Sequence, residues 1–146
     1  IRHFNFTDAE REEKIKSVLE KVSLEEAIDK MPSELSGGMK KRIGLARSII
    51  TEPKLMLYDE PTTGLDPITS KEISSLILEL QKSLKMTSIV VTHDLLCAEI
   101  IADRAIVLNE GAVQHSGTIT ELTTSRDPFL RNFFSHEIIE EQNRRI

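Results

Sequence analysis

The sequence predicts an α/β fold in which a largely parallel sheet is flanked by helices. Short apolar runs at residues 55–58 and 87–91 have the length and composition of strands. Amphipathic helical patterns come before, between and after these two runs. Alternation of strand and helix is typical of a parallel sheet, because parallel strands need a crossover connection. At 146 residues the chain is long enough for one domain, or for a large piece of one.

The chain begins with a predicted amphipathic helix over residues 7–22. Thr7 and Glu10 have the spacing of a capping box, in which each side chain bonds the other's backbone N–H. The residues of its expected buried stripe recur at helical spacing and are Ile15, Val18, Leu19 and Val22.

Two further helices are expected before the first strand. Ser23 and Glu26 repeat the capping-box spacing, so a short helix is predicted over residues 23–30, ending before Pro32. A third helix is predicted over residues 36–50. Its expected stripe consists of Ile43, Ala46, Arg47 and Ile50.

The apolar run at residues 55–58 is predicted to be a strand buried on both faces, as in the middle of a parallel sheet. Asp59 and Glu60 follow it directly. Another helix is expected to start at Asp66-Pro67, since proline suits the first helical position. Its predicted buried stripe consists of Ile73, Leu76, Ile77, Leu80 and Leu84.

The remaining elements are shorter. The expected order is a strand at 87–91, a helix at 95–102, a hairpin of 104–108 with 112–115, and a short helix at 119–122. An apolar cluster follows at Phe129, Leu130, Phe133 and Phe134, and a polar tail is expected after residue 135.

Composition excludes several classes of protein. The net charge of −5 and pI near 5.4 argue against a nucleic-acid partner, which needs a concentrated basic face. A single cysteine, Cys97, excludes an internal disulfide and a multi-cysteine zinc site. No apolar run approaches the roughly 20 residues that cross a bilayer, and no secretory leader opens the chain. Because the chain starts at Ile1 rather than at methionine, further sequence is expected upstream.

Asp59 and Glu60 are the first candidate site residues. Ionised acids at the end of a buried strand are costly unless a cation or hydrogen bonds compensate them, and a Mg²⁺-nucleotide supplies that compensation. In this interpretation Asp59 holds Mg²⁺ through a water and Glu60 polarises the water that attacks a γ-phosphate. The alternative is an ordinary strand that ends in a solvated turn.

Ser36, Gly37 and Gly38 are the second candidate group. A serine and two glycines at a helix start leave backbone N–H groups open to an anion, which the helix dipole also favours. The alternative is a capped turn without a ligand. The cationic residues 40–42 that follow are expected to be solvated helix charges.

Two more candidates lie later in the chain. Asp66, in Gly64-Leu65-Asp66-Pro67, is either a simple helix cap or part of a site. His93 follows the second predicted strand, at the same sheet edge as Glu60, where its imidazole is placed to hydrogen-bond a γ-phosphate or the attacking water. The alternative for His93 is a strand-end histidine satisfied by backbone groups.

Together these segments resemble the ATPases of ABC transporters, over roughly residues 7–135. The match lies in four motifs in a fixed order: Leu35-Ser36-Gly37-Gly38 (signature), Leu57-Tyr58-Asp59-Glu60-Pro61-Thr62 (Walker B), Gly64-Leu65-Asp66 (D-loop) and Thr92-His93-Asp94 (H-loop). The resemblance implies a P-loop-NTPase-like sheet, with a partial helical subdomain at residues 1–50, a catalytic core at 51–127 and an extension at 128–146. It also implies that the first half of the domain, including the P-loop, is missing.

The resemblance implies that ATP and Mg²⁺ are the cofactors, and it assigns a role to each candidate residue. Asp59 is the implied Mg²⁺ ligand, Glu60 the water-activating base and His93 the γ-phosphate sensor. Ser36, Gly37 and Gly38 are implied to clamp the nucleotide of a partner subunit. Asp66 is implied to act as a relay between subunits. The implied partners are a second ABC ATPase subunit, as a homodimer of the full chain, and transmembrane permease subunits. The implied location is cytoplasmic, at the inner face of the inner membrane through the permease.

A finer resemblance is to the ATPases of Mce/Mla-type lipid transporters. It rests on residues 31–34, Met39, residues 66–69 and residues 131–134. It implies phospholipid transport between the membranes of Gram-negative bacteria, with a lipid-binding Mce-type protein as a further partner.

The sequence departs from the family because no Gly-x-x-x-x-Gly-Lys-[Ser/Thr] occurs in it. Without that phosphate cradle the chain as given is expected to be inactive, whereas the full-length protein is expected to hydrolyse ATP. An alternative is a non-catalytic, shortened chain that docks on an intact ABC partner and regulates it. A DNA-clamping ABC-like ATPase is the least favoured alternative, because no heptads of a coiled coil are present.

Overall fold

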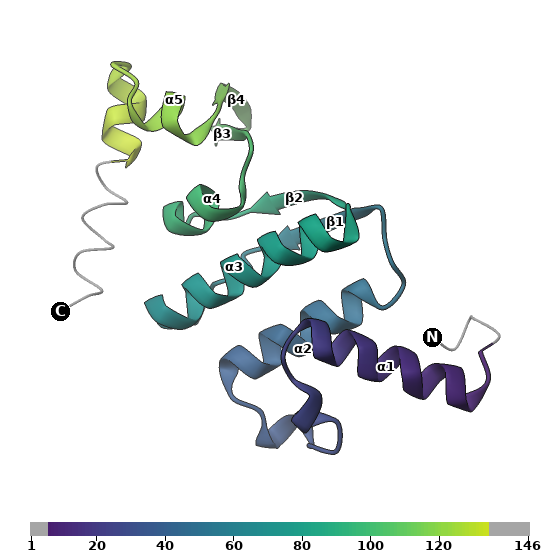
Figure 1. Ribbon diagram of the computed structural model, residues 1–146. Coiled ribbons are helices and arrows are strands. Elements are labelled where there is room, and N and C mark those ends of the chain that lie inside the picture. The colour runs from purple at the N-terminus through teal and green to yellow at the C-terminus, as the bar shows by residue number, and fades with distance from the viewer. Residues whose placement is uncertain (1–5, 135–146) are drawn as a thin grey trace. The chain divides into compact units, whose positions relative to one another are not determined.

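The computed structural model describes residues 6–134, and Figure 1 shows the order of their elements. The chain divides into two compact units, Ile1–Val90 and Val91–Ile146. The predicted boundaries after residues 50 and 127 divide the chain by functional role, not by compactness. They stay predictions. The polar tail predicted after residue 135 lies outside the described residues.

The first unit begins with the predicted helix, α1 (Asp8–Lys21). The capping box is confirmed: the Thr7 N–H donates to the Glu10 carboxylate at 2.7 Å, and the Glu10 N–H donates to Thr7 Oγ1 at 3.3 Å. On the apolar stripe Val18, Leu19 and Val22 are buried. Local sequence therefore fixes both the start of this helix and the face that it packs.

The helix predicted over residues 23–30 is wrong. Only a single 3₁₀ turn, η1 (Glu25–Ala27), forms there, and a second, η2 (Pro32–Glu34), follows it. Ser23 has a positive φ of 53°, and its N–H bonds the Glu20 carbonyl while the Leu24 N–H bonds the Leu19 carbonyl. These two bonds form the Schellman motif that closes α1. Ser23 thus ends one helix and is not available to cap the next.

The third predicted helix is present as α2 (Gly37–Ile49), with Ser36 as its N-cap. Its predicted stripe is wrong in part, since Arg47 is exposed and the buried residues are Leu45, Ala46 and Ile49. The reason is that α2 packs against both α1 and α3, so its buried arc lies between two neighbours.

A β-α-β unit follows, formed by β1 (Leu55–Asp59), α3 (Pro67–Leu84) and β2 (Thr87–Val91). β1 and β2 form a two-stranded sheet. The Thr87 N–H donates to the Lys54 carbonyl at 2.9 Å, which joins the start of one strand to the start of the other, as in a parallel pair. The predicted stripe of α3 is confirmed at four buried residues, Ile73, Leu76, Ile77 and Leu80.

β1 is not buried on both faces, so that prediction is wrong. Met56 and Tyr58 are buried, but Leu55 and Leu57 are 52% and 69% exposed. On β2, Ile89 is 55% exposed as well. Because side chains alternate along a strand, one face of this sheet is packed and the other presents large aliphatic side chains.

The second unit contains four shorter elements at close to their predicted positions. They are α4 (Leu95–Ile101), β3 (Ala105–Asn109), β4 (Ala112–Gly117) and α5 (Ile119–Thr123). A helix at residues 128–134 was not predicted, since only an apolar cluster was expected there. β3 and β4 pair antiparallel around Glu110-Gly111, both with positive φ as a two-residue hairpin turn requires.

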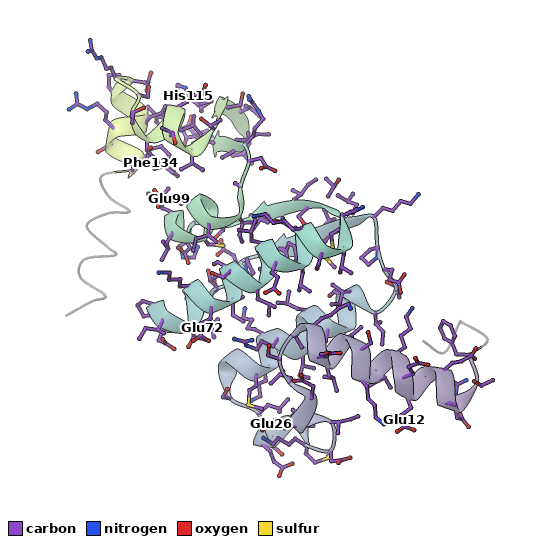
Figure 2. The ribbon with its side chains drawn as sticks, in the orientation of Figure 1. Glu12, Glu26, Glu72, Glu99, His115 and Phe134 are labelled. Atoms are coloured by element: carbon purple, nitrogen blue, oxygen red, sulfur yellow. The ribbon has the colours of Figure 1, made fainter. Side chains whose placement is uncertain are left out.

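The core of the second unit is small and apolar. One buried cluster consists of Val107, Leu122, Leu130 and Phe134, and Cys97 and Ile101 on α4 are buried as well. Figure 2 marks Phe134 and His115 in this unit. Of the predicted apolar cluster, Leu130 and Phe134 are buried, whereas Phe133 is 38% exposed. Within residues 6–134, no helix is both long and apolar enough to span a bilayer.

Candidate functional site

The start of α2 and the start of α3 lie together in the first unit and line a pocket of about 450 Å³. The pocket is lined by Ser36–Met39 and Gly64–Asp66, with Arg42, Thr69 and Glu72. The structure thus brings together two of the candidate groups that the sequence separates by almost thirty residues.

Small residues are what allow the two helix starts to approach. A Cβ added at Gly38 would lie only 2.8 Å from Thr69 Cγ2, which is closer than real Cβ atoms come to another heavy atom. A Cβ at Gly37 would lie at an ordinary 3.6 Å from a Leu65 methyl group. A side chain at residue 38 would therefore force Thr69 or α3 to shift, whatever Gly38 also does toward a ligand.

The start of α2 has the geometry of an anion site. Ser36 caps the helix, its Oγ accepting from the Met39 N–H at 3.2 Å and its carbonyl from the Lys40 N–H at 2.9 Å. The helix dipole places partial positive charge at this end, beside the pocket. Phosphate oxygens fit such a place, so the predicted role of Ser36, Gly37 and Gly38 is chemically sound and stays a prediction.

Asp66 does act as the cap of α3. Its Oδ1 accepts from the N–H groups of Ile68 and Thr69 at 3.1 and 3.0 Å, and its Oδ2 accepts from the Thr69 hydroxyl at 2.5 Å. The hydroxyl and amide of Thr69 lower the pKa of the Asp66 carboxyl below its ordinary value. Asp66 is therefore a carboxylate at neutral pH. Its relay between subunits stays a prediction.

Arg42 connects three helical segments around the pocket. Its Nη1 donates to the Val22 carbonyl at the end of α1 (3.1 Å), and its Nη2 pairs with the carboxylate of Glu72 on α3 (3.2 Å). Figure 2 labels Glu72 on this helix. Nothing in the sequence distinguishes Arg42 from a solvated helix charge, because both of its partners are far away along the chain.

Asp59 and Glu60 lie at the end of β1 as predicted. Asp59 is exposed, and Glu60 adopts a left-handed backbone with a φ of 47°. The Glu60 carbonyl accepts from the Thr63 N–H at 3.3 Å and from Lys41 Nζ at 3.3 Å. Its carboxylate accepts from the Thr63 hydroxyl at 3.0 Å. Lys41 thus joins the end of β1 to α2, the helix whose start lines the pocket.

His93 lies just after β2 and before α4. It is exposed, and the next residue, Asp94, caps α4 by accepting from the Cys97 N–H at 3.0 Å. His93 belongs to the second unit, whereas Glu60 belongs to the first. The approach of His93 to the same phosphate as Glu60 stays a prediction.

The carboxylate of Asp59 suits a metal ion that is held partly by the protein and partly by a nucleotide. Among residues 6–134 there is no group of three or more His, Cys, Asp or Glu side chains placed to bind a metal ion. Mg²⁺ is commonly held by one or two carboxylates together with substrate phosphates and water. Asp59 fits the first of these requirements, and the phosphates and other ligands would come from outside the described residues.

Comparison with known families identifies the class of protein. The family model described as ABC transporter matches residues 2–63, the span that holds the start of α2 and the end of β1. Together with the relatives below, this match shows that the chain belongs to the ABC-transporter ATPase family. The predicted family resemblance is confirmed.

Individual relatives agree. The chain is similar to the methionine import ATP-binding protein MetN of Streptococcus mutans, with 34% identity over 134 residues, 91% of this chain and 38% of that protein. It is also similar to MetN of Streptococcus pyogenes, with 35% identity over 122 residues, 84% of this chain and 34% of that protein. The chain therefore spans little more than a third of these relatives.

A solved structure confirms the fold class. The structure of cbiO1 from Clostridium perfringens, part of the ABC transporter complex cbiONQ, matches with a TM-score of 0.77 and 32% identity. The match covers 99% of this chain and 54% of cbiO1. The α/β, P-loop-NTPase-like fold predicted from the sequence is thus confirmed for about half of such a domain.

Proposed function

We propose that the whole protein to which this chain belongs is the ATP-hydrolysing subunit of an ABC transporter. The observation that carries the proposal is the pocket at the starts of α2 and α3, together with the hydrogen bond from Lys41 on α2 to the Glu60 carbonyl. The segments proposed as signature and D-loop line that pocket, and the segment proposed to carry the catalytic base is bonded to the same helix α2.

In this proposal each residue contributes what its chemistry allows. When bound, Mg²⁺ would supply charge neutralisation for the phosphates, and Asp59 is the carboxylate that would hold it. The Glu60 carboxylate orients the attacking water and accepts its proton. The N–H groups after Ser36 face the nucleotide of a second subunit and stabilise negative charge on it. His93 donates to the γ-phosphate, and Asp66 connects the start of α3 to that second subunit.

The chain as given is proposed to be inactive. Its sequence contains no Gly-x-x-x-x-Gly-Lys-[Ser/Thr] to cradle the phosphates. The exposed aliphatic face of β1 and β2 supports the view that part of the domain is missing from this chain. Its residues are Leu55, Leu57 and Ile89, and proteins seldom leave such a group of large aliphatic side chains in water. We infer that a further part of the same ATPase domain covers this face and carries the phosphate cradle.

The proposed partners are a second copy of the ATPase subunit and the transmembrane subunits of a permease. Such an arrangement places the protein in the cytoplasm, at the inner face of the membrane. The solved relative cbiO1 is part of a transporter complex, which supports a permease partner for this protein too.

The transported substrate is the finest part of the proposal. The phospholipid prediction, with its Mce-type partner, rests on short segments such as residues 31–34 and 131–134. The two MetN relatives named above are methionine import ATP-binding proteins and give that prediction no support. Methionine import is thus the competing assignment. Reconstitution with the native permease separates the two, since only the true substrate should stimulate ATP hydrolysis.

The first test compares Mg-ATP hydrolysis by this chain with hydrolysis by the protein extended upstream through its native reading frame. We expect turnover in the extended protein alone. If neither hydrolyses ATP, the alternative of a regulator that docks on an intact ABC partner takes its place. A pull-down with a P-loop-competent ATPase then becomes the deciding measurement.

A further inference from the structure

The side chain of Lys41 joins α2 to the turn that follows β1. Lys41 is partly buried, and its Nζ lies 3.3 Å from the carbonyl oxygen of Glu60, 19 residues later in the chain. Its neighbour Lys40 is exposed, and no hydrogen bond or ion pair of its side chain is recorded within residues 6–134. Two adjacent lysines on one helix therefore have different surroundings.

The accepting group is the backbone of a strained residue. A left-handed conformation costs a non-glycine residue roughly 1–2 kcal/mol, so neighbouring contacts must hold Glu60 at its φ of 47°. Two donors meet its carbonyl, the Thr63 N–H from within the turn and Lys41 Nζ from α2. Of these two donors, the Lys41 ammonium group is the one that comes from another element.

The direction of the Glu60 carboxylate depends on this backbone. Its side chain is short of rotational freedom because the Thr63 hydroxyl also donates to the carboxylate at 3.0 Å. A rotation about the backbone bonds of Glu60 would therefore change where its carboxylate lies relative to Thr63 and the end of β1. Hydrogen bonds from a charged donor are about twice as strong as neutral ones, so the ammonium group is well suited to prevent that rotation.

We propose that Lys41 is a positioning residue for Glu60. It holds the backbone from which the carboxylate projects and ties it to the helix whose first turn carries Ser36, Gly37 and Gly38. The placement of Glu60 thereby depends on the placement of the signature helix within the same subunit. This inference rests on the proposed function, in which Glu60 is the water-activating base.

The test uses the protein extended through its native reading frame, with the variants Lys41→Met, Lys41→Arg and Lys40→Met. The measurements are kcat and KM for Mg-ATP and the thermal midpoint of each variant. We expect Lys41→Met to lower kcat about tenfold, with KM changed less than about twofold, because a charge-assisted hydrogen bond is lost without loss of a nucleotide contact. Lys41→Arg should restore most of kcat, since a guanidinium also donates to a carbonyl.

Lys40→Met is the matched control, because it removes the same charge from the same helix. Its kcat should stay within about twofold of the parent if the contact, and not the field of a nearby cation, is what matters. Equal losses in the two methionine variants would overturn the inference. So would a Lys41→Met protein with unchanged kcat, or one in which a lower thermal midpoint is the sole effect.

Glu60→Gln separates failure of this inference from failure of the proposed function. If Glu60→Gln keeps the parent turnover, the assignment of the base is wrong, and with it the premise. If Glu60→Gln loses turnover, Lys41→Met is added to it. No further loss is expected, because Lys41 acts through Glu60, whereas a further tenfold loss of the residual rate would show an independent role and overturn the inference.

Discussion

Two regions of the first unit differ in how completely the described residues bury and bond their side chains. At the starts of α2 and α3, helix caps, the contact of Gly38 with Thr69 and the hydrogen bonds of Arg42 satisfy the local groups. In the sheet of β1 and β2, one face is buried and the other exposes leucine and isoleucine side chains. The helix starts are thus a locally complete structure, whereas the sheet leaves one apolar face exposed.

The largest effect is expected at Glu60, the residue that links the two regions. In the extended protein, Glu60→Gln should lower turnover by about 10²–10⁴-fold, because the amide cannot accept the proton of the attacking water. Nucleotide binding, measured by titration with a fluorescent ATP analogue, should persist. Glu79→Gln is the control, since Glu79 is an exposed carboxylate on α3. Full turnover in the Glu60 variant would contradict the assigned role.

The next effect concerns the open face of the sheet. Leu57 is 69% exposed here, but if more of the domain covers it, Leu57→Ala in the extended protein should lower the free energy of unfolding by about 2–3 kcal/mol. Ile68, which is 74% exposed at the start of α3, is the control, and Ile68→Ala should change it by less than about 0.5 kcal/mol. Urea unfolding without nucleotide measures both. Equal, small changes would mean that the sheet face stays open, and the comparison would fail.

A pair of glycines on α2 tests the locally complete region. Gly38→Ala should destabilise the extended protein by about 1–3 kcal/mol, because its new methyl group overlaps the Thr69 side chain. Gly44→Ala should stabilise it by about 0.5–1 kcal/mol, because alanine favours a helix and a Cβ there has no heavy atom within 4 Å. Thermal unfolding reports both. Changes of the same sign would show that the two helix starts have room to separate.

The smallest effect is a shift in acid stability at the cap of α3. Because the pKa of Asp66 is lowered in the folded protein, its carboxylate contributes stability above the ordinary pKa and loses it as the pH falls through the folded value. Thr69→Val removes the hydroxyl donor, so it should raise the folded pKa and make the stability that is lost between neutral and acid pH smaller. Thr69→Ser keeps the donor and should preserve that loss. Urea unfolding at neutral pH and at a pH below the folded pKa compares the three proteins, and the same loss in all three would remove Thr69 as the cause.

Much of the first unit was predictable because its decisive contacts are local. The caps at Thr7, Ser36 and Asp66 each involve groups within three residues of the cap. The stripe of α3 and the turn at Glu110-Gly111 likewise follow from short periods and from residue types. The failure at Ser23 is also local, since one serine had two possible uses and the closing of α1 took precedence.

By itself, the sequence determined the family, the order of the motifs and the candidates Asp59, Glu60 and Ser36–Gly38, because each depends on residue types at fixed spacing. Tertiary structure decided which of the three adjacent cationic residues 40–42 bond to distant parts of the chain. Lys41 meets Glu60 across 19 residues and Arg42 meets Glu72 across 30. It also decided which face of β1 is buried. Such contacts depend on the angles at which α2, α3 and the strands pack, and no short-range pattern encodes those angles.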